Sequence, residues 1–255
     1  MSLNNYRYVY CRPCDLSSLN SVKAFVEEYK KKENQLSGLI NNAGVMNTPR
    51  SFSKDGIEMH FAVNHLGHFT LTSLLMETLK ATPKSQIQFL INLDYRKGSI
   101  DFEDLNHTKN FDKSQAFRQS QLANMMFVTE LASMLLKDTS SSVSVNAVYP
   151  GVCNTDIKRH MPVDKSFSAY FIANPMMWFF TKSAEYGAQT SIFLLTRGWD
   201  ESGLGKLYSK LKEIPIDEVA LDSSVNQKLL AIDRYWCGLD KSKQESLSVV
   251  ASGKL

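Results

Sequence analysis

Two cysteines with the spacing Cys11-Arg12-Pro13-Cys14 are a first candidate for metal or redox chemistry. A structural zinc site needs two more ligands than one such pair supplies, and no second pair follows. We expect Asp15 to raise the pKa of the Cys14 thiol by like-charge repulsion, which disfavours a redox role. The pattern therefore predicts cysteines that pack without chemistry.

Three histidines, His60, His65 and His68, occur in one predicted helix. Only the last two are one helical turn apart, and no third ligand is evident beside them. We therefore predict that the chain binds no metal.

Small residues at the ends of two predicted strands could approach a nucleotide closely. Asn42-Ala43-Gly44 follows a buried strand, and Pro150-Gly151, with Thr155 beyond it, follows another. Doubly wound sheets bind ligands at the carboxyl ends of their strands, where small residues leave room for a close approach. Tight turns that bind nothing are the alternative interpretation of both stretches.

Strands and helices alternate along the chain. We predict strands over 6–10, 37–41, 86–92, 143–148 and 206–209, and helices over 17–32, 54–80, 114–136, 184–196 and 223–236. Such alternation indicates an α/β fold, with a doubly wound, Rossmann-like parallel sheet and helices on both faces. We predict a single domain over 1–240 and a flexible tail over 241–255.

Composition restricts the functions open to this domain. Its 255 residues are 43% hydrophobic and 22% charged, with a net charge of only +3, which argues against nucleic acid as a partner. We see no signal peptide and no apolar stretch of the roughly 18–20 residues that span a membrane. Four cysteines without a disulfide pattern favour a reducing compartment, so we expect an intracellular protein, cytoplasmic or membrane-associated.

Four motifs, taken together and in this order, resemble the short-chain dehydrogenase/reductase superfamily, specifically its retinol-dehydrogenase-like branch. They are Asn41-Asn42-Ala43-Gly44, Asn64-His65-Leu66-Gly67-His68-Phe69, Ser120-Gln121-Leu122-Ala123 and Pro150-Gly151-Val152-Cys153-Asn154-Thr155. The similarity extends from about Tyr8 to Leu239.

The resemblance implies a nicotinamide cofactor, NADP or NAD. Asp15 and Leu16 match the adenine-contacting positions, and Asn42, Ala43 and Gly44 match those beside the adenosine ribose. Pro150, Gly151 and Thr155 match the nicotinamide clamp. From the residues alone, Asp15 could instead be the N-cap of the next helix.

The catalytic positions that the resemblance implies are altered. Phe117 stands where the family has its acid–base Tyr, Gln121 where it has Lys, and Asn92 where it has Ser. Phe has no proton to give and neutral Gln cannot lower a neighbouring pKa, whereas Asn could still donate to an oxyanion. Tyr95, near Asn92 in sequence, is a candidate replacement for the missing phenol.

Asn64 matches the family asparagine that kinks its helix and holds a proton-relay water. A solvent-facing side chain would equally explain an asparagine in mid-helix.

The chain contains no Gly-x-x-x-Gly-x-Gly turn and begins at what corresponds to the third strand of the family fold. Without that phosphate-binding turn, we expect dinucleotide affinity to fall severely. The strand over 6–10 must then pair with the strand over 37–41 or leave an apolar edge exposed.

Two further features bear on partners. The aromatic and Met-rich segment 167–180, where the family places a substrate lid, suits an apolar small molecule, peripheral membrane contact or simple helix packing. The family often forms dimers through the helix over 114–136, which is apolar at Met125, Met126, Val128 and Leu131, so a homodimer is expected.

Three functions remain open. The favoured one is a catalytically impaired or inactive relative that binds an apolar ligand or a protein partner. The second is an active NAD(P)-dependent oxidoreductase on an apolar alcohol or carbonyl such as a retinoid. The third is a non-functional truncated isoform, which predicts aggregation rather than cooperative melting.

Overall fold

The computed structural model describes residues 9–153, 183–197 and 203–240. The elements in chain order are α1 (Leu19–Lys32), β1 (Gly38–Asn41), the π-helical segment η2 (Phe61–Leu66), α2 (Gly67–Lys80), β2 (Gln86–Leu90), the 3-10 helix η3 (Leu93–Lys97), α3 (Lys113–Lys137), β3 (Ser144–Tyr149), α5 (Ala184–Arg197), β4 (Lys206–Ser209), β5 (Lys212–Ile214), the 3-10 helix η5 (Glu218–Ala220) and α7 (Ser223–Trp236).

The described strands form one sheet in the order β1-β2-β3-β4-β5. The first four are parallel, and β5 pairs antiparallel with β4. β5 was not predicted, because the turn between β4 and β5 lacks the usual Asn-Gly signal. Lys210 and Leu211 form it with φ angles of 50° and 65°.

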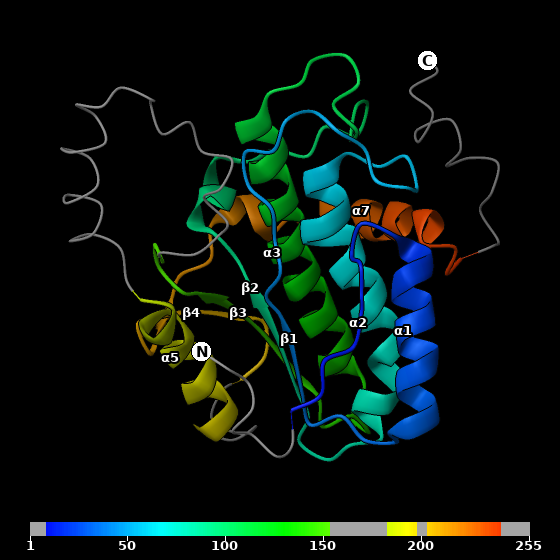
Figure 1. The fold of residues 1–255 in the computed structure, drawn as a ribbon. Coiled ribbons are helices and arrows are strands. Elements are labelled where there is room, and N and C mark those ends of the chain that lie inside the picture. Colours follow the sequence, from blue (N-terminus) through cyan, green and yellow to red (C-terminus); the bar gives the residue numbers. More distant parts are fainter. Residues whose placement is uncertain (1–8, 154–182, 198–202, 241–255) are drawn as a thin grey trace.

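Helices cover both faces of the sheet, which confirms the predicted α/β architecture. Figure 1 shows α1, α2 and α3 on one side and α5 on the other. Gly38 makes the α5 contact close, since a Cβ there would lie 3.2 Å from the Leu195 side chain. The main core lies between the sheet and α2 and α3, where Phe127 packs edge-on to Phe69 and Phe89 with ring centroids 4.8 and 5.6 Å apart.

The apolar residues of α3 belong to this core. Met125, Met126, Val128 and Leu131 are all at most 5% exposed within a single chain. Their hydrophobicity is therefore explained by packing, and it no longer supports a dimer interface.

The predicted first strand is wrong in its described part. Val9 and Tyr10 form no strand and are 52% and 77% exposed, while residues 6–8 lie outside the described part of the chain. Alternating aromatic residues suit a strand, but a strand also needs a neighbour to pair with. Within the described residues β1 is the outer strand, with Ile40 42% exposed on it.

The helix predicted over 54–80 begins later. Lys54, Asp55 and Gly56 form a turn in which Gly56 has a φ of 77°, and the Asp55 carboxylate accepts a hydrogen bond from the Leu19 N–H at 2.8 Å. Helical structure starts at Met59 and passes through η2 before α2.

None of the helices in the described ranges is long and apolar enough to span a membrane. The predicted tail, 241–255, and the segment 167–180 both lie outside those ranges. The domain boundaries therefore remain a prediction.

Candidate functional site

The loop after β1 is fixed by Asn64. The Asn64 Nδ2 donates to the Val45 carbonyl at 2.9 Å, and the Val45 N–H donates to Asn64 Oδ1 at 2.7 Å. Asn64 is 1% exposed, so a solvent-facing role is wrong. Asn42 and Ala43 are exposed at the carboxyl edge of the sheet. This asparagine therefore holds the loop that the resemblance assigns to the ribose.

Asn64 also joins its helix to α3. Its Nδ2 donates to Ser120 Oγ at 2.9 Å, and Ser120 Oγ donates to the Phe117 carbonyl at 2.7 Å. The Asn64 carbonyl accepts from Asn124 Nδ2 at 2.8 Å and lies 2.9 Å from His68 Nδ1. The π-helical geometry of η2 thus supports a dense, buried hydrogen-bond network.

Phe117, which the resemblance assigns to the family's tyrosine position, carries an apolar ring with no proton to donate. Phe117 is 4% exposed, and its ring packs edge-on to His60 at 6.3 Å. Glu58 lies 2.8 Å from His60 Nδ1 and, despite its burial, has a lowered pKa because of that partner. The Phe117 ring is therefore packed against protein side chains and is almost closed to solvent.

The structure brings Asn92 and Gln121 together. The Asn92 N–H donates to Gln121 Oε1 at 2.8 Å, and Asn92 Oδ1 accepts from the Asp94 N–H at 2.9 Å as the cap of η3. Gln121 is 6% exposed. A neutral amide that binds backbone thus occupies the position that the resemblance assigns to the family's lysine.

Tyr95 does not replace the missing phenol. It is fully buried, and its hydroxyl oxygen accepts a hydrogen bond from the Asp217 N–H at 2.9 Å. This bond fixes the chain before η5, so the role of Tyr95 is structural.

Pro150 and Gly151 follow β3, and Gly151 adopts the positive φ of 88° that such a turn requires. Tyr149, which sequence reasoning missed, lies at the same strand end. Its pKa is raised by burial, then by Asp94 and Cys153. Its place in the sequence directly before Pro150-Gly151 could have predicted that Tyr149 lies at this strand end. Thr155 lies outside the described residues.

Asp15 is an exposed acid and not the N-cap of α1. Its Oδ1 accepts from the Ser17 N–H and hydroxyl at 2.9 and 2.6 Å, and these bonds lower its pKa. The N-cap is Ser18, whose Oγ accepts from the Ser21 N–H. The adjacent Leu16 lies against α2, because a Cβ on Gly67 would be 2.6 Å from its carbonyl oxygen.

Cys11 is exposed, and Cys14 is partly buried. Cys11 and Cys14 are free thiols, and the pKa of Cys14 is raised by burial and then by Asp15. Throughout the described ranges, no group of three or more His, Cys, Asp or Glu side chains could hold a metal ion.

The residues present fit part of a dinucleotide. The exposed Asn42-Ala43 turn and the Gly151 turn leave backbone accessible at the carboxyl edge of β1 and β3. The sequence contains no glycine-rich turn that would cradle the pyrophosphate. These two turns are the ones that the resemblance assigns to the ribose and the nicotinamide.

A parallel sheet with helices on both faces and such loops at its carboxyl edge defines an α/β protein of the nucleotide-binding type. Residues 2–98 match the family model described as short chain dehydrogenase. Human retinol dehydrogenase 14 is 40% identical over 230 residues, which are 90% of this chain and 67% of that protein. Human retinol dehydrogenase 13 is 38% identical over 234 residues, 91% of this chain and 70% of that protein.

Solved structures show the same fold. An uncharacterised protein from Mycobacterium paratuberculosis has a TM-score of 0.64 at 24% identity and covers 89% of this chain and 75% of its own. L-sorbose reductase from Gluconobacter frateurii, solved with NADPH and L-sorbose, has a TM-score of 0.56 at 17% identity, with 76% and 72% covered. The chain belongs to the short-chain dehydrogenase family, in its retinol-dehydrogenase-like branch. It spans about two thirds of the length of these retinol dehydrogenases.

Proposed function

We propose that this protein has lost the acid–base chemistry of its family and acts by binding an apolar ligand or a protein partner. One observation carries the proposal. Phe117 presents a buried phenyl ring at the tyrosine position, and Gln121 is bonded to the Asn92 backbone at the lysine position.

The chemical consequence follows from the proton balance of carbonyl reduction. A hydride that reaches the carbonyl carbon leaves negative charge on oxygen, which an acid must neutralise. Phe117 has no such proton, and losing a positioned acid costs on the order of 10²–10⁴ in rate. Gln121 carries no charge to lower the pKa of a substitute. Asn92 has an amide that could donate a hydrogen bond to the carbonyl oxygen. This interaction alone does not replace a proton donor.

A nicotinamide cofactor would supply the hydride. We propose that Asp15, Leu16, Asn42, Ala43 and Gly44 would lie along its adenosine half, and that Pro150, Gly151 and Thr155 would lie along the nicotinamide. Because the residues of this chain include no pyrophosphate-binding turn, we propose that this chain by itself binds NADP or NAD weakly.

A second candidate is an active NAD(P)-dependent oxidoreductase on an apolar alcohol or carbonyl such as a retinoid. The names of the 40% and 38% identical relatives favour it. The two proposals differ in one result, which is turnover by the unaltered protein.

Three further expectations are retained as proposals. They are peripheral membrane contact through 167–180, a homodimer, and an intracellular location without nucleic-acid partners.

Restoring the family residues tests the proposal. Purified protein and the variant F117Y/Q121K/N92S are titrated with NADPH and NADH by fluorescence, and oxidation of each cofactor by retinal is followed. A matched control, F52Y/Q35K, makes the same Phe-to-Tyr and Gln-to-Lys changes at exposed positions. We expect no turnover by the unaltered protein or the control, and a gain only in the first variant. Saturable turnover by the unaltered protein would establish the second candidate instead.

A further inference from the structure

The loop after β1 is held at a second point by the buried side chain of His60. The Thr48 N–H donates to His60 Nε2 at 3.2 Å, and the Thr48 hydroxyl lies 3.3 Å from the same nitrogen. Thr48 is 6% exposed and His60 is fully buried. Asn64 holds the same loop at Val45. Two side chains of the following helix therefore fix the part of the loop that comes directly after Asn42-Ala43-Gly44.

The carboxylate of Glu58 determines which nitrogen of His60 carries the hydrogen. His60 Nδ1 lies 2.8 Å from Glu58 Oε1, and Glu58 Oε2 accepts from the Phe61 N–H at 3.0 Å. A backbone N–H is always a donor, so His60 Nε2 must present its lone pair to Thr48. The hydrogen is then on Nδ1, where Glu58 accepts it. The geometry therefore gives a neutral imidazole of one defined tautomer.

Glu58 is itself fixed from several sides. It pairs with Phe52 in an antiparallel bridge, and its N–H donates to Asn106 Oδ1 at 3.0 Å. Although burial acts to raise the pKa of this carboxyl, hydrogen bonds, first that with His60, lower it below its usual value. A buried carboxylate is costly unless such bonds compensate it. The ionised form is therefore built into this part of the fold.

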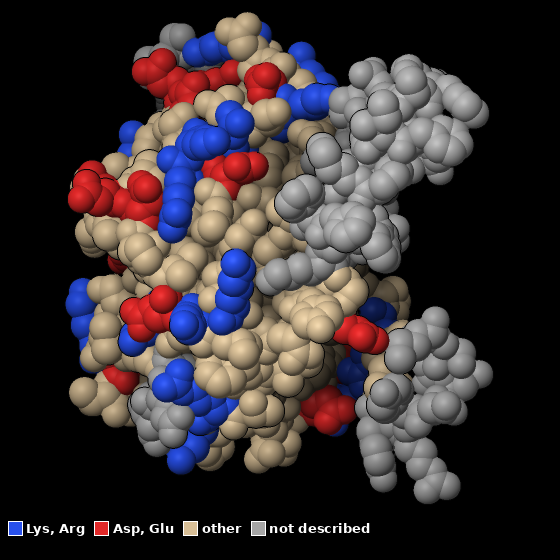
Figure 2. All heavy atoms as spheres, turned by 90° about the vertical axis from the view of Figure 1, so that its left-hand side faces the viewer, with Lys and Arg blue, Asp and Glu red and all other residues tan. Residues whose placement is uncertain are grey.

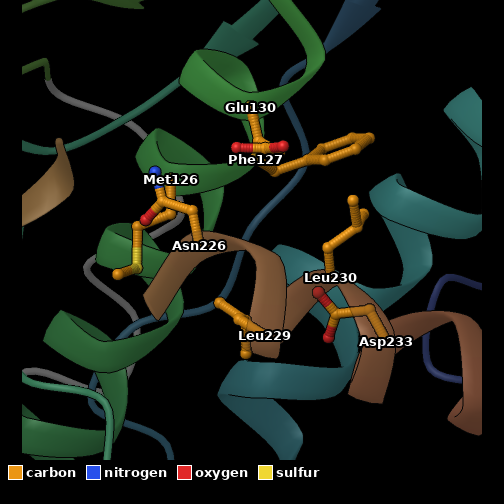
Figure 3. A pocket seen from close by; sticks show the side chains of 7 residues that line it. All are labelled: Met126, Phe127, Glu130, Asn226, Leu229, Leu230 and Asp233. Carbon is orange, nitrogen blue, oxygen red and sulfur yellow. The ribbon is translucent and has the colours of Figure 1, made fainter. Parts of the chain in front are cut away.

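A second buried carboxylate–imidazole contact, between Asp233 and His65, is less constrained. Asp233 Oδ2 lies 2.9 Å from His65 Nε2, but Asp233 Oδ1 is buried with no hydrogen-bond partner among the described residues. Figure 3 shows this carboxylate beside a small cavity between α3 and α7. Both oxygens of Glu58, in contrast, accept hydrogen bonds. Glu58 therefore has no second orientation that would satisfy its partners equally well.

The ring of His60 has no alternative orientation either. Phe117 packs edge-on against it, with ring centroids 6.3 Å apart. A ring turned over about its own axis would place carbon atoms at Glu58 and Thr48 and lose both hydrogen bonds. Packing alone would not require a carboxylate on one side of the ring and a backbone N–H on the other.

We propose that Glu58 and His60 are positioning residues for the loop after β1. Glu58 sets the tautomer of His60, and His60 holds Thr48 and with it the turn at 42–44 that is assigned to the adenosine ribose. Both side chains are fully buried, so they act through the loop and not by touching a ligand. The link from this loop to a ligand rests on the proposed function, whereas the positioning itself does not.

The tautomer is tested on the unaltered protein. Histidine labelled with ¹⁵N is introduced, and the ring signals of His60 are assigned by their loss in H60Q. At neutral pH we expect a neutral ring with the hydrogen on Nδ1. A neutral ring with the hydrogen on Nε2, or a doubly protonated ring, would overturn the proposal.

The variant E58Q tests the effect on the loop. An amide has one acceptor and one donor group, so it cannot accept from both His60 and Phe61. We expect amide hydrogen exchange at Thr48 to become about tenfold or more faster, because its bond to His60 is weakened. Exchange at Val145, buried in β3, reports global unfolding and should change less.

The matched control E27Q makes the same change at an exposed position of α1 and should leave exchange at Thr48 unaltered. Equal exchange at Thr48 in E58Q, E27Q and the unaltered protein would overturn the proposal. An equal acceleration at Thr48 and Val145 in E58Q would also overturn it, since Glu58 would then stabilise the whole fold without positioning the loop.

Titration with NADPH by fluorescence separates this proposal from the proposed function. If the unaltered protein binds NADPH, we expect weaker binding by E58Q, by up to the factor seen in exchange, because the loop must first return to its place. Equal affinities despite faster exchange would overturn the link to the ligand. If the unaltered protein does not bind NADPH, the proposed cofactor contacts fail, while the tautomer and the exchange rates still decide the positioning.

Discussion

Both polar atoms of the buried Asn64 side chain form hydrogen bonds within the protein. Its amide donates to Val45 and Ser120 and its oxygen accepts from Val45, so one residue links the loop after β1 to α3. Its position in mid-helix was a sequence signal that it is special. Its partners could not be predicted, because Ser120 is 56 residues away and meets it only through packing.

Replacing this side chain tests its role. We expect N64A to lower the free energy of unfolding by about 2–4 kcal/mol, because buried donors and acceptors of Val45 and Ser120 lose their partner. Chemical denaturation measures the change. The control N110A removes an exposed asparagine and should stay within about 0.5 kcal/mol of the unaltered protein. Equal effects of the two substitutions would show that Asn64 does not hold the loop.

The residues at the positions that the resemblance assigns to catalysis could be identified from the sequence, whereas their surroundings could not. Gln121 was identified by its place in a motif, whereas its bond to the Asn92 backbone depends on how α3 meets the end of β2. For Tyr95, closeness in sequence to Asn92 led to a wrong hypothesis. Its hydroxyl contacts the backbone of Asp217, which is 122 residues away in the sequence.

At the scale of elements, η2 and the start of α2 set the position of Leu16. Gly67 allows this contact, because a Cβ there would lie 2.6 Å from the Leu16 carbonyl oxygen and 2.9 Å from its Cβ. Periodicity predicts the helix but not the π-helical turn, which depends on side chains from distant elements. The same limit applies to the strand predicted over 6–10.

A methyl group at this contact should be costly. We expect G67A to destabilise the protein by about 1–3 kcal/mol, since the backbone of Leu16 must shift although alanine itself favours helices. Urea unfolding gives the value. Unchanged or increased stability would mean that the loop before α1 moves freely and is not positioned by α2.

At the scale of the whole molecule, charged side chains are mixed on the face shown in Figure 2, and several histidines are buried. Figure 2 shows lysines and arginines scattered among acidic and uncharged residues on one face, in agreement with a net charge of +3. Within the described residues, His60, His65 and His68 are buried. His60 and His65 contact carboxylates, whereas His68 contacts the Asn64 carbonyl. Composition alone could not separate these settings, because they depend on which helices pack together.

His68 makes stability depend on pH. Burial lowers its pKa to about 4, below the usual value near 6.5, and repulsion from His65 adds to this. Between these two values the unfolded chain binds the proton and the folded chain does not. The free energy of unfolding should therefore fall as pH decreases from about 6.5 to 4, by at most about 1.4 kcal/mol per pH unit from this group.

The variant H68N isolates that contribution. Asparagine can still donate to the Asn64 carbonyl but takes up no proton, so the pH slope should become shallower by up to the same amount. Denaturation curves at several pH values measure it. An identical slope in both proteins would show that His68 is protonated in the folded state or solvated.

Transfer of deuterium from the cofactor to retinal shows whether this protein has lost hydride transfer. Retinal is incubated with the protein and with NADPH or NADH deuterated at both C4 positions, and the retinol is analysed by mass spectrometry. We predict no more deuterated retinol than in buffer without protein. Retinol one mass unit heavier, formed in proportion to the protein concentration, would contradict the account.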